Sequence, residues 1–343
     1  MRIALDAMGS DGAPTIDVQG GVQAARDTGH EVVLVGDQTR LAEILARENL
    51  QGATVSIEHA SQVVEMGEHP AQAVRAKKDA SIVVAMGLLR DGKVDAVVSA
   101  GNSGGVLAAS LASAGRIGRI PGVHRPAIST ILPTLQGHLF MLDIGANTDC
   151  KPEWLVQFAH MGAAYAEHVL GISQPRIALL SNGEEKGKGS TLVQETAALL
   201  ESAPCGLNLV GNVEGKDLFR GLADVVVSDG FSGNIAIKTA EGTASMLLRV
   251  LRDEIKARPL AMAGALLAKP AFGAVRKRLD FREYGGGALL GVDGVVVIAH
   301  GRSDALAIRN AIRVAISACE RNIVQSIRDR LQKVTALPDS SPA

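Results

Sequence analysis

The polar segment at residues 182–189, with the sequence NGEEKGKG, has the residue types best suited to hold an anion. It follows an apolar run at 176–180 that we expect to be a buried strand, and a helical pattern begins near Ser190. Backbone N–H groups of glycine turns and helix N-termini bind small oxyanions, and Lys186 and Lys188 would add positive charge. The segment therefore predicts a generic anion site. The open alternative is that its lysines pair with neighbouring glutamates in solvent.

Two common nucleotide-binding motifs are absent from the chain. The dinucleotide pattern GxGxxG fails at its best starting point, because Gly187 and Gly189 are followed by Leu192. The nearest approach to the pattern GxxxxGK[ST] lacks its final hydroxyl residue. We therefore expect no nucleotide cofactor. Asp6 and Asp11 flank the first turn and could hold a divalent ion, but such carboxylates more often cap helices, so no metal is predicted.

Short runs rich in Val, Ile and Leu alternate with longer helical patterns along the chain. Many of these runs lack polar alternation, as strands covered on both faces do, so the rhythm predicts a mostly parallel sheet with helices on both sides. The expected strands are 2–8, 31–35, 94–99, 127–132, 138–144, 176–180, 207–210, 223–228 and 295–299. The expected helices are 15–28, 38–48, 72–89, 152–170, 191–202, 235–256 and 303–333.

Glycine-rich polar turns follow most of the expected strands. In open α/β sheets the ligand crevice lies beyond the carboxyl ends of the strands, so repeated turns of this kind predict a single crevice. Any one turn is explained as well by the turn and helix-capping preferences of Gly, Asn, Ser and Asp. The repetition favours the crevice.

Composition excludes several classes of protein. The net charge is −1 and aromatic residues make up 3%, so nothing favours nucleic acid as a partner. Three widely spaced cysteines predict no disulfide framework and fit a reducing cytosol. No window approaches the roughly 18 apolar residues of a spanning helix. We expect one α/β catalytic domain at 1–335, with an amphipathic hairpin at 256–280, and a disordered tail at 336–343.

Several blocks of the sequence resemble the bacterial phosphate acyltransferase family, the acyl-acyl-carrier-protein:phosphate transacylases. The blocks are LDAMGSDGAP (5–14), DIGAN (143–147), LSNGEEKG (180–187), GNVEG (211–215), VSDGFSGN (227–234) and AHGRS (299–303). They occur in the expected order over essentially the whole chain. One departure is Ser10, where the family commonly has glycine; serine should be tolerated there unless the position needs a positive φ.

The resemblance implies transfer of a long-chain fatty acyl group from acyl carrier protein to inorganic phosphate, which gives acyl phosphate for bacterial phospholipid synthesis. It also implies a three-layer α/β/α homodimer related to isocitrate and isopropylmalate dehydrogenases. The protein would be cytoplasmic and peripherally associated with the inner face of the cell membrane.

Such a reaction could run on positioning alone. Phosphate is a poor nucleophile until it is oriented, whereas a thioester is a reactive acyl donor, so no covalent intermediate is needed. We expect Cys150 to be an inert thiol. Asp229 or His300 could hold the phosphate proton, although Asp229 could only cap a helix and His300 could simply be satisfied at a strand end. The catalytic candidates are Lys186, Asp229, Asn234 and His300. The candidates for substrate binding are Gly9, Asp11, Asn102, Asn147, Asn182, Gly187, Lys188, Gly189, Asn212 and Ser232.

The stretch at 256–280 predicts a second functional surface. Pro259 and Pro270 should break it into a hairpin of short helices, and basic residues bracket its apolar ones. Its length excludes spanning, and its composition suits an anionic bilayer or acidic acyl carrier protein, with a dimer or core contact as the open alternative. The expected membrane contacts are Leu260, Met262, Leu266, Leu267 and Phe272.

Rival functions differ in their use of this stretch. A short-chain phosphotransacetylase that uses coenzyme A would share the fold and the phosphate site but would have little use for the hairpin. A NAD-linked decarboxylating dehydrogenase lacks its motifs. A non-catalytic scaffold that binds membrane or carrier protein would make no acyl phosphate.

Overall fold

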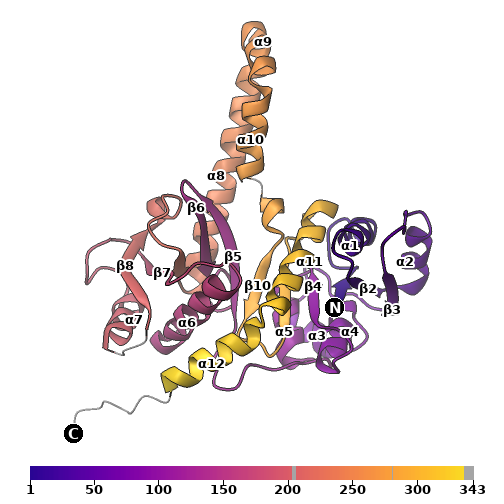
Figure 1. Ribbon diagram of the computed structural model, residues 1–343, viewed down its shortest axis with the longest axis horizontal. Coiled ribbons are helices and arrows are strands. Elements are labelled where there is room, and N and C mark those ends of the chain that lie inside the picture. Colours follow the sequence, from indigo (N-terminus) through magenta and orange to yellow (C-terminus); the bar gives the residue numbers. More distant parts are fainter. Residues whose placement is uncertain (203–205, 280, 336–343) are drawn as a thin grey trace.

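The computed structural model describes residues 1–202, 206–279 and 281–335, so the expected tail and Asp280 lie outside the described residues (Figure 1). The chain forms one eleven-stranded sheet in the order β3-β2-β1-β4-β11-β10-β5-β6-β9-β7-β8. The strands are β1 (Arg2–Asp6), β2 (Glu31–Gly36), β3 (Val55–His59), β4 (Ala96–Ser99), β5 (Ala127–Thr134), β6 (Gly137–Leu142), β7 (Arg176–Ser181), β8 (Asn208–Glu214), β9 (Val225–Val227), β10 (Gly287–Leu290) and β11 (Val295–Ile298).

The sheet has two parallel halves joined by antiparallel strands. All neighbouring pairs are parallel except β11–β10, β10–β5 and β5–β6. Because there are three antiparallel steps in succession, β6, β9, β7 and β8 run opposite to β11, β4, β1, β2 and β3. The last residue of β11, Ile298, pairs with Gly287 of β10, and the last residue of β6, Leu142, pairs with Ser129 of β5. Because β10 and β5 pair with each other, the carboxyl ends of β11 and β6 lie at neighbouring positions. The carboxyl ends of both halves therefore meet near the middle of the sheet.

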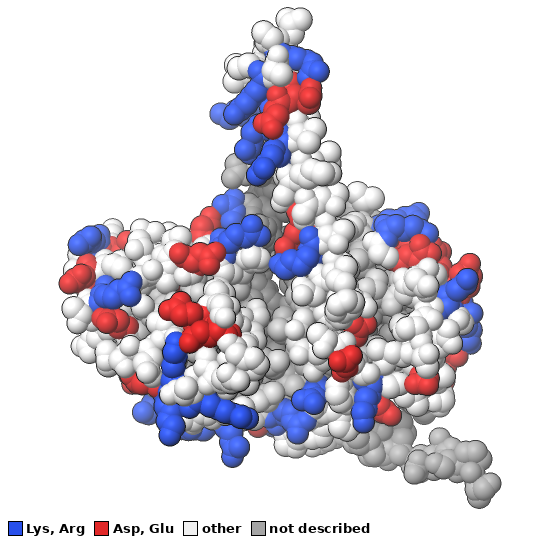
Figure 2. Space-filling model, turned by 180° about the vertical axis from the view of Figure 1, so that it is seen from behind, with Lys and Arg blue, Asp and Glu red and all other residues white. Residues whose placement is uncertain are grey.

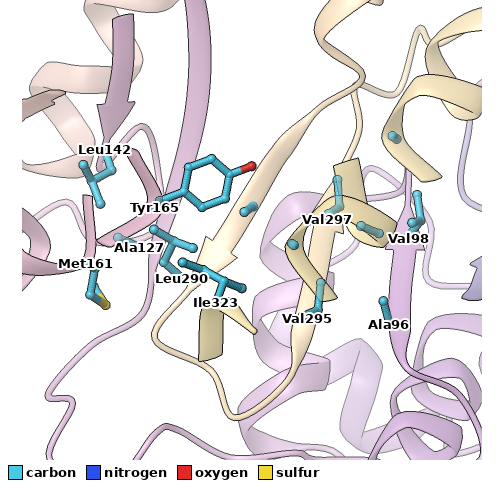
Figure 3. Close-up of a cluster of buried hydrophobic side chains, with 14 of the residues drawn as sticks. Ala96, Val98, Ala127, Leu142, Met161, Tyr165, Leu290, Val295, Val297 and Ile323 are labelled. Carbon is cyan, nitrogen blue, oxygen red and sulfur yellow. The ribbon is translucent and has the colours of Figure 1, made fainter. Parts of the chain in front are cut away.

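Alternate residues of the strands enter different apolar clusters, which creates the layers. In β1, Ile3 and Leu5 join one cluster and Ala4 joins another, and in β4, Val98 and Val97 divide in the same way. Since both faces are apolar, each must be covered by helices, as the uninterrupted Val and Ile runs predicted. Figure 3 shows the first cluster crossing the molecule, with side chains from β4, β5, β6, β10 and β11 together with α6 and α12.

Helices cover both faces, which confirms the expected three-layer α/β/α fold. Helices α1, α6, α7, α11 and α12 supply the first cluster, α3, α4 and α5 the second, and α8 packs on the second half. The helices are α1 (Thr15–Thr28), α2 (Gln38–Leu45), α3 (Pro70–Ala76), α4 (Ser81–Arg90), α5 (Ser103–Ala112), α6 (Pro152–His168), α7 (Thr191–Ser202), α8 (Gly230–Lys256), α9 (Pro259–Leu267), α10 (Lys269–Leu279), α11 (Ala305–Glu320) and α12 (Ile323–Thr335).

Several elements differ from the sequence-based expectation. The strands β3 and β10 and the helix α5 were not expected; α5 is rich in Gly, Ala and Ser and carries little helical patterning. The expected helix at 72–89 is two helices, because Ala80 forms a bridge with Gln62 between them. The expected helix at 303–333 is two helices, Ala305–Glu320 and Ile323–Thr335, and Asn322 between them has a left-handed φ of 50°. Ser10 does not have a positive φ, so the departure from glycine costs no strain there.

A helical arm projects from the body of the molecule (Figure 1). The long α8 forms its rising part, and α9 and α10 form the short helices that Pro259 and Pro270 indicated. None of the described helices is long and apolar enough to cross a membrane. The division of the chain into a domain at 1–335 and a tail stays a prediction.

Candidate active site

A cavity of about 450 Å³ lies where the two halves of the sheet meet. Its apolar lining includes Ile298, from the second cluster, and Ile237 of α8, from a smaller cluster on the second half of the sheet, and Ile144 packs against both clusters. The cavity thus occupies the face of the sheet where the helical layer passes from α3–α5 to α8. Its polar side chains are Asn102, Ser103, Ser129, Thr130, Asn234, Lys238, Glu241, Tyr284, His300 and Ser303.

The turn after β6 fixes the position of α8. The buried Asp143 carboxylate accepts hydrogen bonds from four backbone N–H groups and from the Asn147 side chain. The N–H of Gly230 donates to the Asn147 carbonyl at 2.7 Å, and a Cβ on Gly233 would lie 2.0 Å from the Asp143 carbonyl oxygen. Glycine at 233 is therefore required for α8 to dock on this turn.

One face of α8 then points into the cavity. Asn234, Ile237, Lys238 and Glu241 have helical spacing and all line it. The Lys238 Nζ lies 2.9 Å from Glu241 Oε2 and 3.4 Å from His300 Nε2. These three side chains form a contiguous group of one cation, one anion and one imidazole at the wall of the cavity.

His300 enters the cavity from the turn after β11. The Arg302 N–H donates to His300 Nδ1 at 3.2 Å, so in the neutral ring the proton belongs on Nε2. The pKa of His300 is lowered, first by burial and then by the positive charge of Lys238, and a neutral ring is favoured at pH 7. Nε2–H and the Lys238 ammonium are then two donors that lie 3.4 Å apart at the cavity wall. An oxyanion there can accept from both.

The turn after β4 lines the other side of the cavity with Gly101, Asn102 and Ser103, and the turn after β1 packs against it. A Cβ on Gly9 would lie 2.8 Å from Gly101, so the two turns meet this closely because residue 9 is glycine. The Asp11 N–H donates to the Gly301 carbonyl at 2.8 Å. Asn102 caps α5 by accepting from the Gly105 N–H at 3.1 Å and donates to a neighbouring carbonyl at 3.0 Å. The first N–H groups of α5 thus lie at the cavity wall.

Ser103 also lines the cavity, inside the stretch GNSGG at 101–105. This stretch fits the GxSxG pattern of serine nucleophiles and lies between a strand and a helix, as that pattern requires. Within the described residues, Ser103 makes no hydrogen bond to a histidine, so the base that activates such a serine is not in contact with it.

The segment at 182–189 lies outside the cavity lining. Lys186 pairs with Glu201 at 2.8 Å, and its side chain is 82% exposed. Asn182 accepts from the Gly189 N–H at 3.0 Å, and Asn212 donates to two carbonyls of the segment at 3.3 and 3.4 Å. The polar groups of the segment hold its own shape, and two of its glycines, Gly187 and Gly189, have φ of 96° and 101°.

The predicted site residues therefore fall into three groups. Asn102, Asn234 and His300 line the cavity. Asp229 caps α8 by accepting from the Ser232 N–H at 2.8 Å, and Asn147 Nδ2 donates to Pro126 and Asp143. The lysines, glycines and asparagines of the 182–189 segment, together with Asn212, lie outside the cavity lining. The catalytic role of Lys186 and the binding role of the others stay predictions, and they compete with the cavity as the phosphate site.

A metal site and a reactive cysteine find little support in the described residues. The carboxylates of Glu184, Glu214 and Asp217 lie within 4.8 Å of one another, but Lys216 Nζ is 2.7 Å from Glu214 and 3.3 Å from Glu184. The lysine supplies the countercharge. Burial raises the pKa of the Cys150 thiol to about 12, with the charge of Asp143 adding to it, so this thiol stays protonated as expected.

Lys238 and Glu241 were missed by the sequence analysis. Both were available from spacing, because they follow Asn234 by four and seven residues and so share its helix face. The missing step was the starting point of the helix. Beginning α8 at Ile235 placed Asn234 in a turn and left no helix face to extend from it.

The sequence is similar to known proteins over nearly its full length. A family model described as "Fatty acid synthesis protein" matches residues 1–326. The phosphate acyltransferase of Dictyoglomus turgidum is 51% identical over 336 residues, 98% of this chain and 99% of that protein. The phosphate acyltransferase of Heliobacterium modesticaldum is 50% identical over 96% of this chain and 98% of that protein.

Solved structures share the fold at low identity. A phosphotransacetylase from Streptococcus pyogenes superposes with a TM-score of 0.62 at 16% identity, covering 93% of this chain and 94% of that chain. The 4-hydroxythreonine-4-phosphate dehydrogenase of Klebsiella pneumoniae gives 0.52 at 17%, covering 93% and 97%. These likenesses confirm the expected dehydrogenase-like α/β fold.

Proposed function

The chain belongs to the fatty acid synthesis protein family of phosphate acyltransferases, and from this premise we propose that it moves a long-chain fatty acyl group from acyl carrier protein to inorganic phosphate. It is an acyltransferase. An oxygen of hydrogenphosphate attacks the thioester carbonyl, a C–O bond forms and the C–S bond breaks. The phosphate proton ends on the released thiol, so the products are acyl phosphate and free carrier protein.

The single observation that carries this proposal is the convergence of Lys238, His300 and Asn234 on one cavity. The lysine and Nε2–H of the histidine bind and orient the anion, and the asparagine is a neutral donor. Holding phosphate against a bound thioester turns a slow bimolecular step into an intramolecular one, worth up to ~7–11 kcal/mol in ideal cases. The same donors stabilise the oxyanion that forms at the carbonyl carbon.

The test is to incubate the purified protein with palmitoyl-acyl-carrier-protein and labelled phosphate and to measure palmitoyl phosphate. The proposal expects acyl phosphate without an acyl-enzyme. Faster use of acetyl-coenzyme A would favour a short-chain phosphotransacetylase, and no product at all would favour a non-catalytic scaffold. Acyl label on Ser103, lost in Ser103→Ala together with activity, would replace direct attack by a covalent route.

We also propose that the arm holds the protein on the inner face of an anionic membrane. Leu260 is 90% exposed and Leu267 is 86% exposed at its tip. Figure 2 shows basic side chains, with some acidic ones among them, on the arm beneath an uncharged tip, and Lys256, Arg258 and Lys269 flank α9. Apolar side chains can enter the headgroup region while the basic ones meet anionic lipid.

Replacing Leu266 and Leu267 by Glu tests this contact. The double variant should lose binding to vesicles with anionic lipid and keep its melting temperature. Leu135→Glu is the matched control, because Leu135 is 74% exposed and lies outside the arm. Unchanged vesicle binding of the double variant would contradict the membrane proposal. If the variant loses vesicle binding but still binds acyl carrier protein, these leucines contact the membrane and not the carrier protein.

A homodimer is the oligomeric state that we propose. The arm exposes a second apolar strip on α8, where Met246, Leu247 and Val250 are 53–63% exposed. A strip of this kind is more often covered than left in solvent. Sedimentation equilibrium should give twice the mass of 35.6 kDa. A single species of 35.6 kDa at micromolar concentration would contradict a stable dimer.

A further inference from the structure

The cavity contains a carboxylate that an anion site does not need for affinity. Glu241 is the one acidic side chain among the described residues that line it. Its negative charge repels any bound oxyanion, and like charges brought together in a partly enclosed site are unfavourable. A carboxylate in this place therefore lowers the affinity for an anion unless the anion donates a hydrogen bond to it.

Glu241 is placed to receive a hydrogen bond. Its Oε2 accepts from Lys238 Nζ at 2.9 Å, and Lys238 lies 3.4 Å from His300 Nε2. In the described part of the chain, no hydrogen bond reaches its other oxygen, Oε1. The side chain is 35% exposed, so this oxygen can meet a ligand in the cavity. An anion held by Lys238 and His300 would thus lie beside a carboxylate that can only accept.

Oxyanions differ in whether they can donate to such an acceptor. At neutral pH hydrogenphosphate carries at least one P–OH group, and arsenate carries the corresponding As–OH group. Sulfate has the same shape and charge but no proton. A P–OH group bonded to a carboxylate forms a charge-assisted hydrogen bond, whereas sulfate leaves two acceptors facing each other. One carboxylate can therefore separate two anions that lysine alone cannot.

We propose that Glu241 is a specificity-determining residue that selects hydrogenphosphate over fully deprotonated oxyanions such as sulfate. Its Oε1 accepts the P–OH hydrogen, while Lys238 and His300 donate to the other oxygens. The inference rests on the proposed function, in which phosphate is the acyl acceptor, and it adds the reason why that acceptor is chosen. In this arrangement the proton that phosphate must lose during transfer is hydrogen-bonded to Glu241 Oε1.

The test uses Glu241→Gln, which keeps the shape and replaces an acceptor by a group that can donate. Binding of phosphate, arsenate and sulfate is measured by calorimetry at constant ionic strength and neutral pH. The wild-type protein should bind phosphate and arsenate alike and sulfate at least about tenfold more weakly. The variant should weaken phosphate and tighten sulfate, so that the preference falls by at least about tenfold. In turnover, sulfate should become a stronger competitor of phosphate.

Glu185→Gln is the matched control, because Glu185 lies in the 182–189 segment outside the cavity lining, and it should leave all three affinities unchanged. Glu241→Ala gives a second variant that should also lose the preference. The proposal is overturned if wild-type protein binds sulfate as tightly as phosphate, if it binds no phosphate, or if both variants keep the wild-type ratio.

Binding and turnover separate this proposal from the proposed function. Selective phosphate binding that depends on Glu241, without acyl phosphate formation, would contradict the acyl transfer and leave the selection intact. If acyl phosphate forms but both variants keep the wild-type ratio of phosphate to sulfate affinity, the acyl transfer stands and the selection by Glu241 is contradicted.

Discussion

The segment at 182–189 and the cavity wall at α8 both follow the carboxyl end of a strand, and both carry lysine near glutamate. In the segment, Lys186 pairs with Glu201 on the surface and the asparagines bind the segment's own backbone. At the cavity wall, Lys238 meets both Glu241 and a histidine from another strand end. In the segment the polar groups are paired with nearby protein groups, whereas at the wall Lys238, Glu241 and His300 line a cavity that a ligand can enter.

This difference shows what a glycine-rich turn can and cannot indicate. Glycines at 187 and 189 have left-handed φ and are needed for the shape of the turn. At 9 and 233, glycines are needed because two backbones approach each other at the cavity. The second use brings side chains from distant parts of the chain together, which is what a site requires.

The largest expected difference between the two regions is in the effect of a lysine substitution on turnover. Lys238→Met should lower kcat/KM for phosphate by about 10²–10³, because a charged donor to the transition state is lost. Lys186→Met, the same change in an exposed ion pair, should stay within about threefold. Steady-state kinetics on folded variants decides between them. Equal losses, or a larger loss at Lys186, would move the site to the 182–189 segment.

A second histidine, His160, must be distinguished from His300 before the pH dependence of stability and activity is interpreted. His160 is fully buried with no partner for either ring nitrogen in the described chain, and burial lowers its pKa from 6.5 to about 4. Above pH 6.5 the ring is neutral folded and unfolded. Below it the unfolded state binds a proton that the folded state refuses. The free energy of unfolding should therefore fall by about 3 kcal/mol between pH 6.5 and 4.

Urea unfolding at pH 7 and near pH 4 measures this loss. His160→Leu should flatten it, while His300→Gln should leave it in place and lower activity at neutral pH. If the wild-type and His160→Leu proteins lose stability in parallel on acidification, the assignment to His160 is wrong.

A smaller effect is expected from shifting α8 off its turn. Gly233→Ala places a Cβ against the Asp143 carbonyl and should cost about 1–3 kcal/mol of stability, with a loss of activity as Asn234 and Lys238 move. Gly242→Ala is the matched control on the same helix, because its Cβ would meet nothing within 4 Å. It should be neutral or stabilise by up to about 1 kcal/mol. Thermal melts measure the stability of the two variants, and steady-state kinetics measure their activity. If Gly233→Ala and Gly242→Ala have the same stability and activity, Gly233 has no role in docking α8.

The smallest change is expected within the 182–189 segment. Asn182→Ala removes one partly exposed hydrogen bond to Gly189 and should cost about 0.5–1 kcal/mol. Activity should change by less than about threefold, because Asn182 does not line the cavity. A loss of activity comparable to that of Lys238→Met, in folded protein, would show that the segment acts on the substrate.

The layers of the fold were readable from the sequence, whereas the site was readable only in part. Runs such as Val295–Ile298 are apolar at every position, so they had to be covered on both faces, and they are. Short β10, which begins with Gly287, carries too little pattern to predict, yet it pairs antiparallel with both β11 and β5 and so joins the two halves of the sheet. His300 and Asn234 were found because strand-end turns could be located. Which turns share a cavity depends on strand order, which local sequence does not encode.

The most direct test of the central claim is a crystal structure with phosphate and a non-hydrolysable acyl thioester analogue. We expect phosphate oxygens within about 3 Å of Lys238 Nζ and His300 Nε2, with one oxygen facing Glu241. Phosphate bound instead at Lys186 and Lys188, with the cavity beside α8 free of it, would contradict the account.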